Sequence, residues 1–321
     1  MVIFRKQVWL FAALWLCAVG CKKDMLHFNK VIKIESASDT DRLNKVLFLD
    51  AQNGIICGGS WYKESLILVT HDGGTTWQRN ANSNEQQMLF GATTGPGGSY
   101  YCVGFEGKLW YSNDTGKSWK FEQIEHNFFR DIAVMNDNTY FVVGGISFSE
   151  GIMTRVDSSY HVWSRDAYPW QFNCIRMKDS LTGYICGFGN AYRTDDGGKT
   201  WTLLNVKGDN FMSMDLVGDD IYMCGSVGSV YHSNDKGNSW EVLRNGNDIT
   251  KVSYHLYDIK FSDALHGWAV GEKGVVIYTQ DGGHNWSQYT TFTSQLLTSI
   301  SVANDNIIVV GDNGTIYKLI P

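Results

Sequence analysis

The sequence has few prolines and few charged residues, and its basic residues do not outnumber its acidic ones. Only 3 of its 321 residues are proline, and 19% are Asp, Glu, Lys or Arg. The formal net charge is −6, and removing the first twenty residues takes away Arg5 and Lys6 but no acid, which leaves −8. This acidic balance argues against a nucleic-acid backbone as the main partner. Hydrophobic residues, at 43%, are numerous enough for a folded core and argue against disorder.

The N-terminus lacks an apolar run long enough to be a convincing membrane span. Its apolar segment covers residues 8–20, follows two positive charges, and ends in three small residues directly before Cys21. This pattern resembles a bacterial lipoprotein signal, with residues 1–20 as the signal peptide, Cys21 as the lipidated first residue and residues 21–27 as a tether. A plain secretory signal with a chance cysteine is the alternative. The expected location is the bacterial cell envelope, as an outer-membrane lipoprotein that is periplasmic or surface-exposed.

An even set of paired cysteines is also absent. Besides Cys17 and Cys21, five cysteines remain, an odd number for a disulfide framework in an exported protein. Cys57, Cys186 and Cys224 each stand directly before a glycine at one repeated position, and repeat spacing keeps such copies apart. We therefore predict that these three are small buried hydrophobic residues rather than bridges or ligands.

The sequence does contain an eight-residue segment in five close copies. They are THDGGTTW (70–77), SNDTGKSW (112–119), TDDGGKTW (194–201), SNDKGNSW (233–240) and TQDGGHNW (279–286). A decayed sixth copy, VDSSYHVW, ends at Trp163, with Ser158 in place of the acid and Tyr160 in place of the glycine. The six closing tryptophans are about 42 residues apart, and a period of this size built from short β runs is typical of a β-propeller with one four-stranded blade per repeat.

A second apolar pattern, which ends in glycine, occurs seven times, from GIICGG at 54–59 to IIVVGD at 307–312. The last copy is followed by no eight-residue segment, so its blade lacks a fourth strand. Residues 28–36, FNKVIKIES, have no other place in the count and can supply that strand, which would close the ring by pairing the two ends of the chain. The sequence thus predicts an all-β, seven-bladed β-propeller of four-stranded antiparallel blades over residues 28–321, which we expect to be monomeric.

The repeated segment has the pattern Ser/Thr-x-Asp-x-Gly-x-Ser/Thr-Trp, which we interpret as a hairpin between the third and fourth strands. In the first copy, we expect Asp72 to accept backbone N–H bonds, Gly74 to take a positive φ and Trp77 to cover the sheet. A calcium site is the alternative, although the segment lacks the acid density and the distal Glu of such loops. We predict a structural role for the Asp and Trp of every copy: Asp72, Trp77, Asp114, Trp119, Asp196, Trp201, Asp235, Trp240, Asp281 and Trp286.

This pattern is the Asp-box, or BNR repeat. Its repetition, joined by segments such as GWAVGEKGVVIYTQDGGHNW (267–286), resembles the photosystem II stability/assembly-factor family of seven-bladed propellers. The resemblance covers residues 28–321 and implies a non-catalytic binding or assembly protein. The matching motifs are those that hold the fold together, however, so the resemblance does not carry over photosystem assembly itself.

Asp-boxes also occur in sialidases and other glycoside hydrolases, so an enzyme is the rival interpretation. Sialidase-like catalysis needs three converging arginines, and no Arg-Ile-Pro motif stands near the start. No His-x-x-x-His pair, Ser nucleophile elbow or P-loop is present either. We therefore expect no enzyme activity, catalytic residue, metal or cofactor. Two carboxylates about 5–10 Å apart in the channel mouth would instead favour the glycoside-hydrolase interpretation. The acids to check are Glu106, Glu272 and Asp312.

The loops on the face opposite the Asp-boxes are enriched in aromatic and ionisable residues. We predict that six of them form an aromatic-lined mouth for a protein segment or a sugar: Trp61, Phe128, Arg130, Trp170, Tyr254 and His255. The alternative is that these rings cover blade edges or pack under loops. The predicted function is a non-enzymatic scaffold for protein binding or assembly, with an envelope protein as partner. Surface glycan binding and a divergent glycoside hydrolase remain the alternatives.

Overall fold

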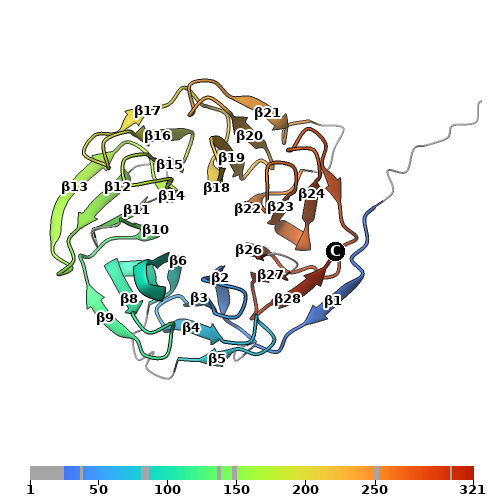
Figure 1. The fold of residues 1–321 in the computed structure, drawn as a ribbon, viewed down its shortest axis with the longest axis horizontal. Helices are drawn as coiled ribbons and strands as arrows, with labels where there is room; N and C mark the ends of the chain where they lie inside the picture. The colour runs from blue at the N-terminus through green and yellow to red at the C-terminus, as the bar shows by residue number, and fades with distance from the viewer. Residues whose placement is uncertain are drawn as a thin grey trace, which may run out of the picture.

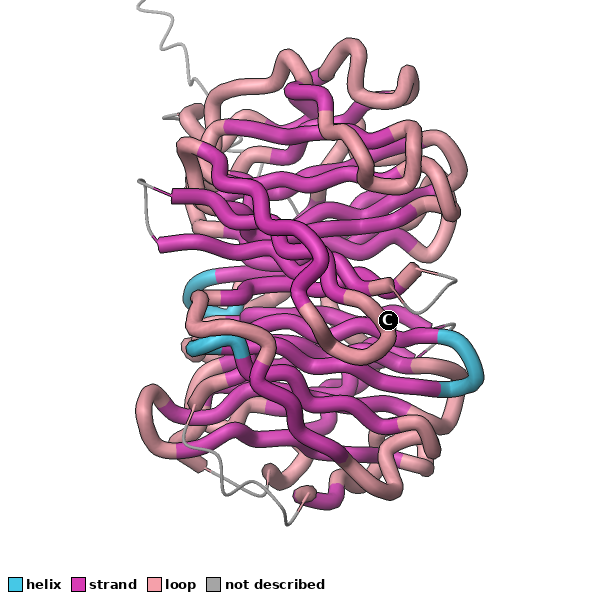
Figure 2. Tube along the Cα trace, turned by 90° about the vertical axis from the view of Figure 1, so that its left-hand side faces the viewer, coloured by secondary structure: helices cyan, strands magenta, loops and turns pink. Residues whose placement is uncertain are grey.

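The computed structural model describes residues 25–36, 39–80, 87–135, 139–146, 150–248, 253–303 and 306–321. These residues form seven four-stranded sheets, in which every neighbouring pair of strands is antiparallel. The sheets stand around a central channel like the blades of a propeller (Figure 1), and in the edge-on view the strands run between two faces covered by loops (Figure 2). The predicted all-β, seven-bladed fold is confirmed. Residues 1–24, which include Cys21 and the predicted signal peptide, lie outside the described residues.

The first four blades follow one another along the chain, and each runs from an inner strand to an outer one. Blade 1 holds β2 (Arg42–Phe48), β3 (Gly54–Ser60), β4 (Glu64–Thr70) and β5 (Gln78–Arg79); blade 2 holds β6 (Leu89–Gly95), β7 (Ser99–Gly104), β8 (Lys108–Ser112) and β9 (Lys120–Gln123). Blade 3 holds β10 (Phe129–Val134), β11 (Tyr140–Ile146), β12 (Glu150–Val156) and β13 (Val162–Tyr168); blade 4 holds β14 (Phe172–Met177), β15 (Gly183–Gly187), β16 (Asn190–Thr194) and β17 (Thr202–Leu203).

Blades 5 and 6 repeat the plan, and blade 7 combines both ends of the chain. Blade 5 holds β18 (Phe211–Val217), β19 (Asp220–Gly225), β20 (Val230–Ser233) and β21 (Glu241–Arg244); blade 6 holds β22 (Leu256–Phe261), β23 (Gly267–Gly271), β24 (Val276–Thr279) and β25 (Ser287–Gln288). Blade 7 holds β26 (Leu297–Ala303), β27 (Asn306–Gly311), β28 (Ile316–Ile320) and β1 (Lys30–Lys33). The described loops contain the short 3-10 turns η1 (Pro96–Gly98), η2 (Phe105–Gly107) and η4 (Glu272–Gly274).

The N-terminal strand closes the ring as predicted. β1 pairs antiparallel with β28, from Lys30 opposite Ile320 to Lys33 opposite Tyr317. Before it, Leu26 forms a bridge with Tyr289 of blade 6, and the Phe28 ring stacks on Tyr289 with centroids 3.7 Å apart. The end of the predicted tether, residues 25–27, therefore lies against blade 6.

The core consists of apolar clusters between neighbouring blades. One such cluster joins Ile55 and Cys57 of blade 1 to Tyr100 and Trp110 of blade 2, and corresponding clusters fill the other six interfaces. Second strands such as β3 and β15 are buried on both faces because each blade packs between two others. Cys57, Cys186 and Cys224 are buried and form no disulfide, which confirms the prediction made for them.

The Asp-boxes are hairpins held together by one carboxylate each. In the third copy, Asp196 Oδ1 accepts the backbone N–H groups of Lys199 and Thr200 at 3.0 and 2.9 Å. Its Oδ2 accepts the Thr200 hydroxyl at 2.6 Å, and the Thr194 hydroxyl donates to Oδ1 at 2.8 Å. Gly198 takes a φ of 78°. In the other four copies the Asp Oδ1 likewise accepts the backbone N–H four residues on, and Oδ2 accepts a hydroxyl or, in the fifth copy, the Asn285 amide.

Candidate functional site

Every inner strand of the ring carries a β-bulge at the same place. In β10, for example, Phe129 lies opposite Gly144 and Asp131 lies opposite Val143, so that Arg130 has no opposite partner. A bulge redirects the side chain of the extra residue and is common beside functional sites. All seven extra residues line one hollow at the end of the central channel: Asn44, Phe90, Arg130, Asn173, Met212, Tyr257 and Thr298.

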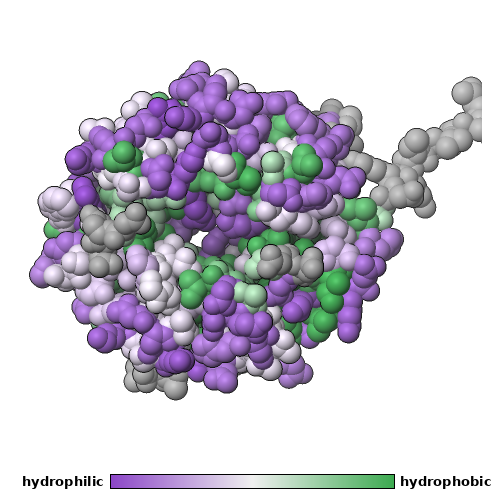
Figure 3. All heavy atoms as spheres, viewed as in Figure 1, coloured by the Kyte–Doolittle hydropathy of each residue, from purple (hydrophilic) through white to green (hydrophobic). Residues whose placement is uncertain are grey.

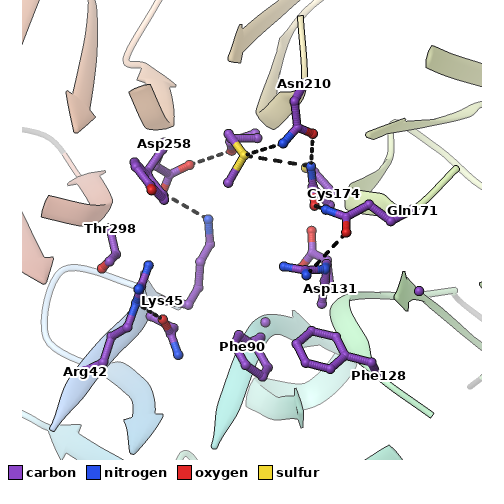
Figure 4. Close-up of a pocket in the computed structure, with 18 of the residues that line it drawn as sticks. Arg42, Lys45, Phe90, Phe128, Asp131, Gln171, Cys174, Asn210, Asp258 and Thr298 are labelled. Atoms are coloured by element: carbon purple, nitrogen blue, oxygen red, sulfur yellow. Dashed lines mark hydrogen bonds and ion pairs between the residues drawn. The ribbon is translucent and has the colours of Figure 1, made fainter. Parts of the chain in front are cut away.

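This hollow, which we call the mouth, has a volume of about 550 Å³. It lies at the ends where the inner strands begin, so it opens on the face opposite the Asp-boxes. Trp61, from the loop between β3 and β4, and Ile146, the last residue of β11, complete its rim. Figure 4 shows residues from around the mouth converging on one space, with Phe90 and Phe128 on one side and Asp258 and Asn210 on the other. A space-filling view of the molecule shows the central opening with hydrophilic and hydrophobic residues around it (Figure 3).

Ion pairs form the floor of the mouth. Lys45 and Arg176 line both the mouth and a second hollow of about 440 Å³ toward the other end of the channel. Lys45 Nζ lies 3.0 Å from Asp258 Oδ2, and Arg176 lies 2.5 Å from Asp131 Oδ2. Burial opposes the charge of Lys45, but Asp258 beside it raises the Lys45 pKa above its ordinary value. These ion pairs lie where the two hollows meet, so the mouth has a charged floor.

One wall of the mouth is aromatic. The Trp61 ring packs against Phe90 and Phe128, with centroid distances of 5.4 and 5.9 Å, and Phe90 lies 4.8 Å from Phe128. Phe105 adds an edge-to-face contact with Trp61 at 5.6 Å. Trp61 keeps 47% of its surface exposed although it touches these rings. The wall therefore presents apolar surface that a bound side chain could cover.

Three of the six predicted binding residues meet in the mouth, namely Trp61, Phe128 and Arg130. The other three do not line it. The Trp170 ring packs on Phe188 at 5.7 Å. Tyr254 is half-buried against the core between blades 5 and 6, and His255 pairs with Glu272 at 3.3 Å. These three residues therefore lie outside the mouth lining, and each contacts a neighbouring ring, the core or a carboxylate instead.

The other six bulge residues were not among the residues predicted to form the mouth. Their common signal is a short pattern at the start of each inner strand, in which a variable residue stands between an apolar residue and a small or charged one. Examples are LFGA (89–92), FRDI (129–132) and LYDI (256–259). The variable residue is the bulge. The pattern is visible only once the repeats are aligned and the bulge is known.

The acids around the mouth are already bound to partners. Glu106 accepts from Gln87 at 3.1 Å, and Asp312 lies 3.5 Å from Arg42. The two carboxylates of the mouth lining, Asp131 and Asp258, hold the cations of the floor. The geometry thus offers a shaped, partly apolar surface rather than a free pair of carboxylates within the described residues. In that same part of the chain, no group of three or more His, Cys, Asp or Glu side chains could hold a metal ion.

No helix within the described ranges is long and apolar enough to cross a membrane.

Comparisons with known proteins agree with the fold. The family model of the photosynthesis system II assembly factor YCF48 matches residues 246–318. The photosystem II assembly lipoprotein Ycf48 of Synechococcus sp. (strain CC9902) is 26% identical over 186 residues, which is 55% of this chain and 55% of that protein. The chain thus matches about half the length of this relative. The chloroplastic photosystem II stability/assembly factor HCF136 of Oryza sativa subsp. japonica is 22% identical over 89% of this chain and 70% of its own length.

Two solved structures of YCF48 superpose on most of the chain. One, described as YCF48 bound to D1 peptide, has a TM-score of 0.70 and 17% identity, and covers 92% of this chain and 97% of its own. The other, YCF48 from Cyanidioschyzon merolae, has a TM-score of 0.69 and 15% identity over 91% and 98%. The WD40 β-propeller domain of Doa1 reaches 0.65 at 11% identity, covering 91% and 96%. At these identities the likeness shows the propeller fold alone.

Proposed function

We propose that this photosystem II assembly-factor-like propeller is a non-enzymatic scaffold that binds a segment of a partner protein in the mouth. The observation that carries the proposal is the ring of seven bulge residues, through which every blade contributes one residue to the lining of the same hollow. The aromatic wall gives this hollow the apolar surface that anchors binding partners. Its acids are held in ion pairs, which leaves binding rather than hydrolysis as the chemistry of the site.

The relatives support this choice of partner. The solved YCF48 with a D1 peptide is a protein of the same fold that binds a polypeptide segment. The relatives matched by sequence carry the names of assembly factors. We propose for this chain the binding of a protein for assembly, with an envelope protein as the partner.

We further propose that the chain is held in the bacterial envelope by a lipid on Cys21. The sequence pattern before Cys21 and the word lipoprotein in the name of the Synechococcus relative support the anchor. Mass measurement of the mature N-terminus tests it directly. We expect a mature chain that begins at Cys21 and carries acyl groups on it. An unmodified Cys21 would contradict the lipid anchor.

Site-specific photo-crosslinking tests the binding proposal. A photoreactive phenylalanine analogue at position 61, on the mouth, should crosslink a defined protein in intact cells, because Trp61 is exposed on the rim. The matched control is the same analogue at position 163, since Trp163 is also an exposed tryptophan, at 65%, but lies on the outer strand of blade 3.

The crosslinked partner should disappear when Phe128→Ala is added, in a variant that keeps its wild-type Tm. Equal crosslinking from both positions, or none from position 61, would contradict the proposal. In the second case a glycan array with the purified chain decides whether the mouth binds sugar instead.

A further inference from the structure

Arg130 has an unusual electrostatic position within the mouth. It is the bulge residue of β10, and its guanidinium lies over the Phe128 ring, 4.5 Å from the centroid. Its only hydrogen bond in the described structure is a long one of 3.4 Å to the Gln171 side-chain oxygen. The Nε atom is buried and has no hydrogen-bond partner among the described residues. Arg130 is therefore a mostly buried cation with unused donors.

The other cations of the mouth differ from Arg130 because each faces a carboxylate. Lys45 pairs with Asp258, Arg176 with Asp131, and Arg42 lies 3.5 Å from Asp312. Within the described ranges, no carboxylate lies in ion-pair distance of Arg130. Burial and the neighbouring Arg42 guanidinium lower the pKa of Arg130 to about 10, which still leaves it charged at neutral pH.

A buried charge without a counterion is costly, and a guanidinium offers two parallel donors to a carboxylate. The surroundings of Arg130 define the rest of the ligand. Phe90 and Phe128 lie beside it on the aromatic wall, and the amides of Gln171 and Asn173 lie on the opposite side. A ligand that pairs with the Arg130 guanidinium and also covers the aromatic wall carries a negative charge next to an apolar or aromatic side chain.

We infer that the mouth binds a polypeptide segment through a carboxylate held by Arg130, with a neighbouring apolar side chain against Phe90, Phe128 and Trp61. The inference rests on the proposed function, because it names the chemistry of the segment that the same mouth would take. The carboxylate can come from an Asp or Glu side chain or from a chain end, and both offer the same pair of oxygens. Arg130 acts as the anchor of the site, and the charged floor below it limits how deeply the segment enters.

The test uses random peptides of eight residues, displayed with blocked ends in one library and with free C-termini in another, and selected on the purified full-length chain. Peptides enriched on the wild type should contain Asp or Glu, or a free chain end, next to Phe, Tyr, Trp or Leu. The best peptide and its neutral counterpart (Asn for Asp, Gln for Glu, or a C-terminal amide) are then compared by calorimetry.

The wild type should bind the acidic peptide at least about 30-fold more tightly than the neutral one. Arg130→Gln should remove this difference, whereas Arg42→Gln, the matched control, should reduce it only slightly because Arg42 already faces Asp312. Arg130→Lys should restore part of the affinity, since it returns the charge without the paired donors. A difference between the two libraries identifies the source of the carboxylate.

Several results would overturn the inference. They are enrichment of peptides without acids, equal affinity of Arg130→Gln for the acidic and neutral forms, or no enrichment in either library. The proposed function fails on a different readout, the absence of a partner crosslinked from position 61 of the wild type. A partner that crosslinks equally to wild type and to Arg130→Gln would support protein binding in the mouth but contradict the binding of a carboxylate by Arg130.

Discussion

The carboxylate of the Asp-box is the residue on which each hairpin depends. In the third copy, the hydroxyl and the backbone N–H of Thr200 lower the pKa of Asp196 to about 2. In the decayed copy of blade 3, Asp157 caps the turn instead and accepts the backbone N–H groups of Ser159 and His161 at 2.8 and 3.0 Å. With Ser158 at the position of the box carboxylate, the closing Trp163 turns outward and is 65% exposed, and Tyr160 packs instead against the rings of Tyr111 and Tyr140.

We expect Asp196→Asn to lower the free energy of unfolding by about 1 kcal/mol at pH 7. This is at the low end for a hydrogen bond to a charged group because the carboxylate lies at the surface. The folded-state pKa is below the ordinary value near 4, so the contribution of the carboxylate is complete above about pH 4 and is lost as the pH falls toward 2. Urea unfolding at pH 7, 4 and 2.5 should therefore show the difference between wild type and variant shrinking at the lowest pH.

The matched control is Asp195→Asn, because Asp195 precedes Asp196 in the same turn but faces Arg193 at the surface. Its free energy of unfolding should change by less than about 0.5 kcal/mol. An Asp196→Asn variant as stable as Asp195→Asn at pH 7 would show that the box carboxylate does not hold the hairpin.

The inner strands act as elements that lock the blades to one another. Asp258 on β22 accepts the hydroxyls of Ser213 on blade 5 at 2.6 Å and Ser299 on blade 7 at 2.7 Å, besides its ion pair with Lys45 of blade 1. Burial opposes the ionised form of Asp258, but Lys45 and Lys260 outweigh it and hold the Asp258 pKa well below its usual range. One buried carboxylate thus connects four of the seven blades.

Asp258→Asn should lower the free energy of unfolding by about 3–5 kcal/mol, since it leaves Lys45 buried beside a neutral amide. The double variant Asp258→Asn/Lys45→Met should recover much of this loss, because it removes the unpaired charge as well. A double-mutant cycle by chemical denaturation gives the coupling energy. A loss below 1 kcal/mol in the single variant would show that the ion pair adds nothing to the ring.

At the scale of the whole molecule, the ring depends on its N-terminal strand. β1 is the outer strand of blade 7, whose other three strands come from the end of the chain. Ile34, which follows β1, is 8% exposed and packs into the cluster between blades 7 and 1. Without this segment, β28 would be an open edge, which invites pairing with other chains.

Removal of residues 1–36 should therefore lower the Tm and cause aggregation that grows with protein concentration, as followed by calorimetry and light scattering. Ile34→Ala should cost about 2–5 kcal/mol through the lost burial and the cavity. Val31→Ala is the control, because Val31 is 36% exposed and its loss should have a small effect. A truncated chain as stable and as soluble as the wild type would contradict the role of β1 in closing the ring.

The sequence was a good guide to the parts of the fold that repeat. Asp72 and its four equivalents predicted the hairpins, and the count of glycine-ended strands predicted seven blades. The mouth was harder to predict because its residues differ from blade to blade. Trp61, Phe128 and Arg130 were found from their loops, whereas Trp170, Tyr254 and His255 share the same composition but pack against Phe188, the core and Glu272.

The sequence by itself determined the architecture of this protein. Turn chemistry and the hydrophobic period are local properties, and five Asp-box turns together with seven glycine-ended strands specify the blades, their number and the strand that closes the ring. Only the tertiary structure decided the site. The bulge of each inner strand brings residues such as Asn44, Arg130 and Tyr257, which are far apart in sequence, into one mouth. Whether a cation there meets a carboxylate depends on neighbours from other blades, and no local pattern encodes that.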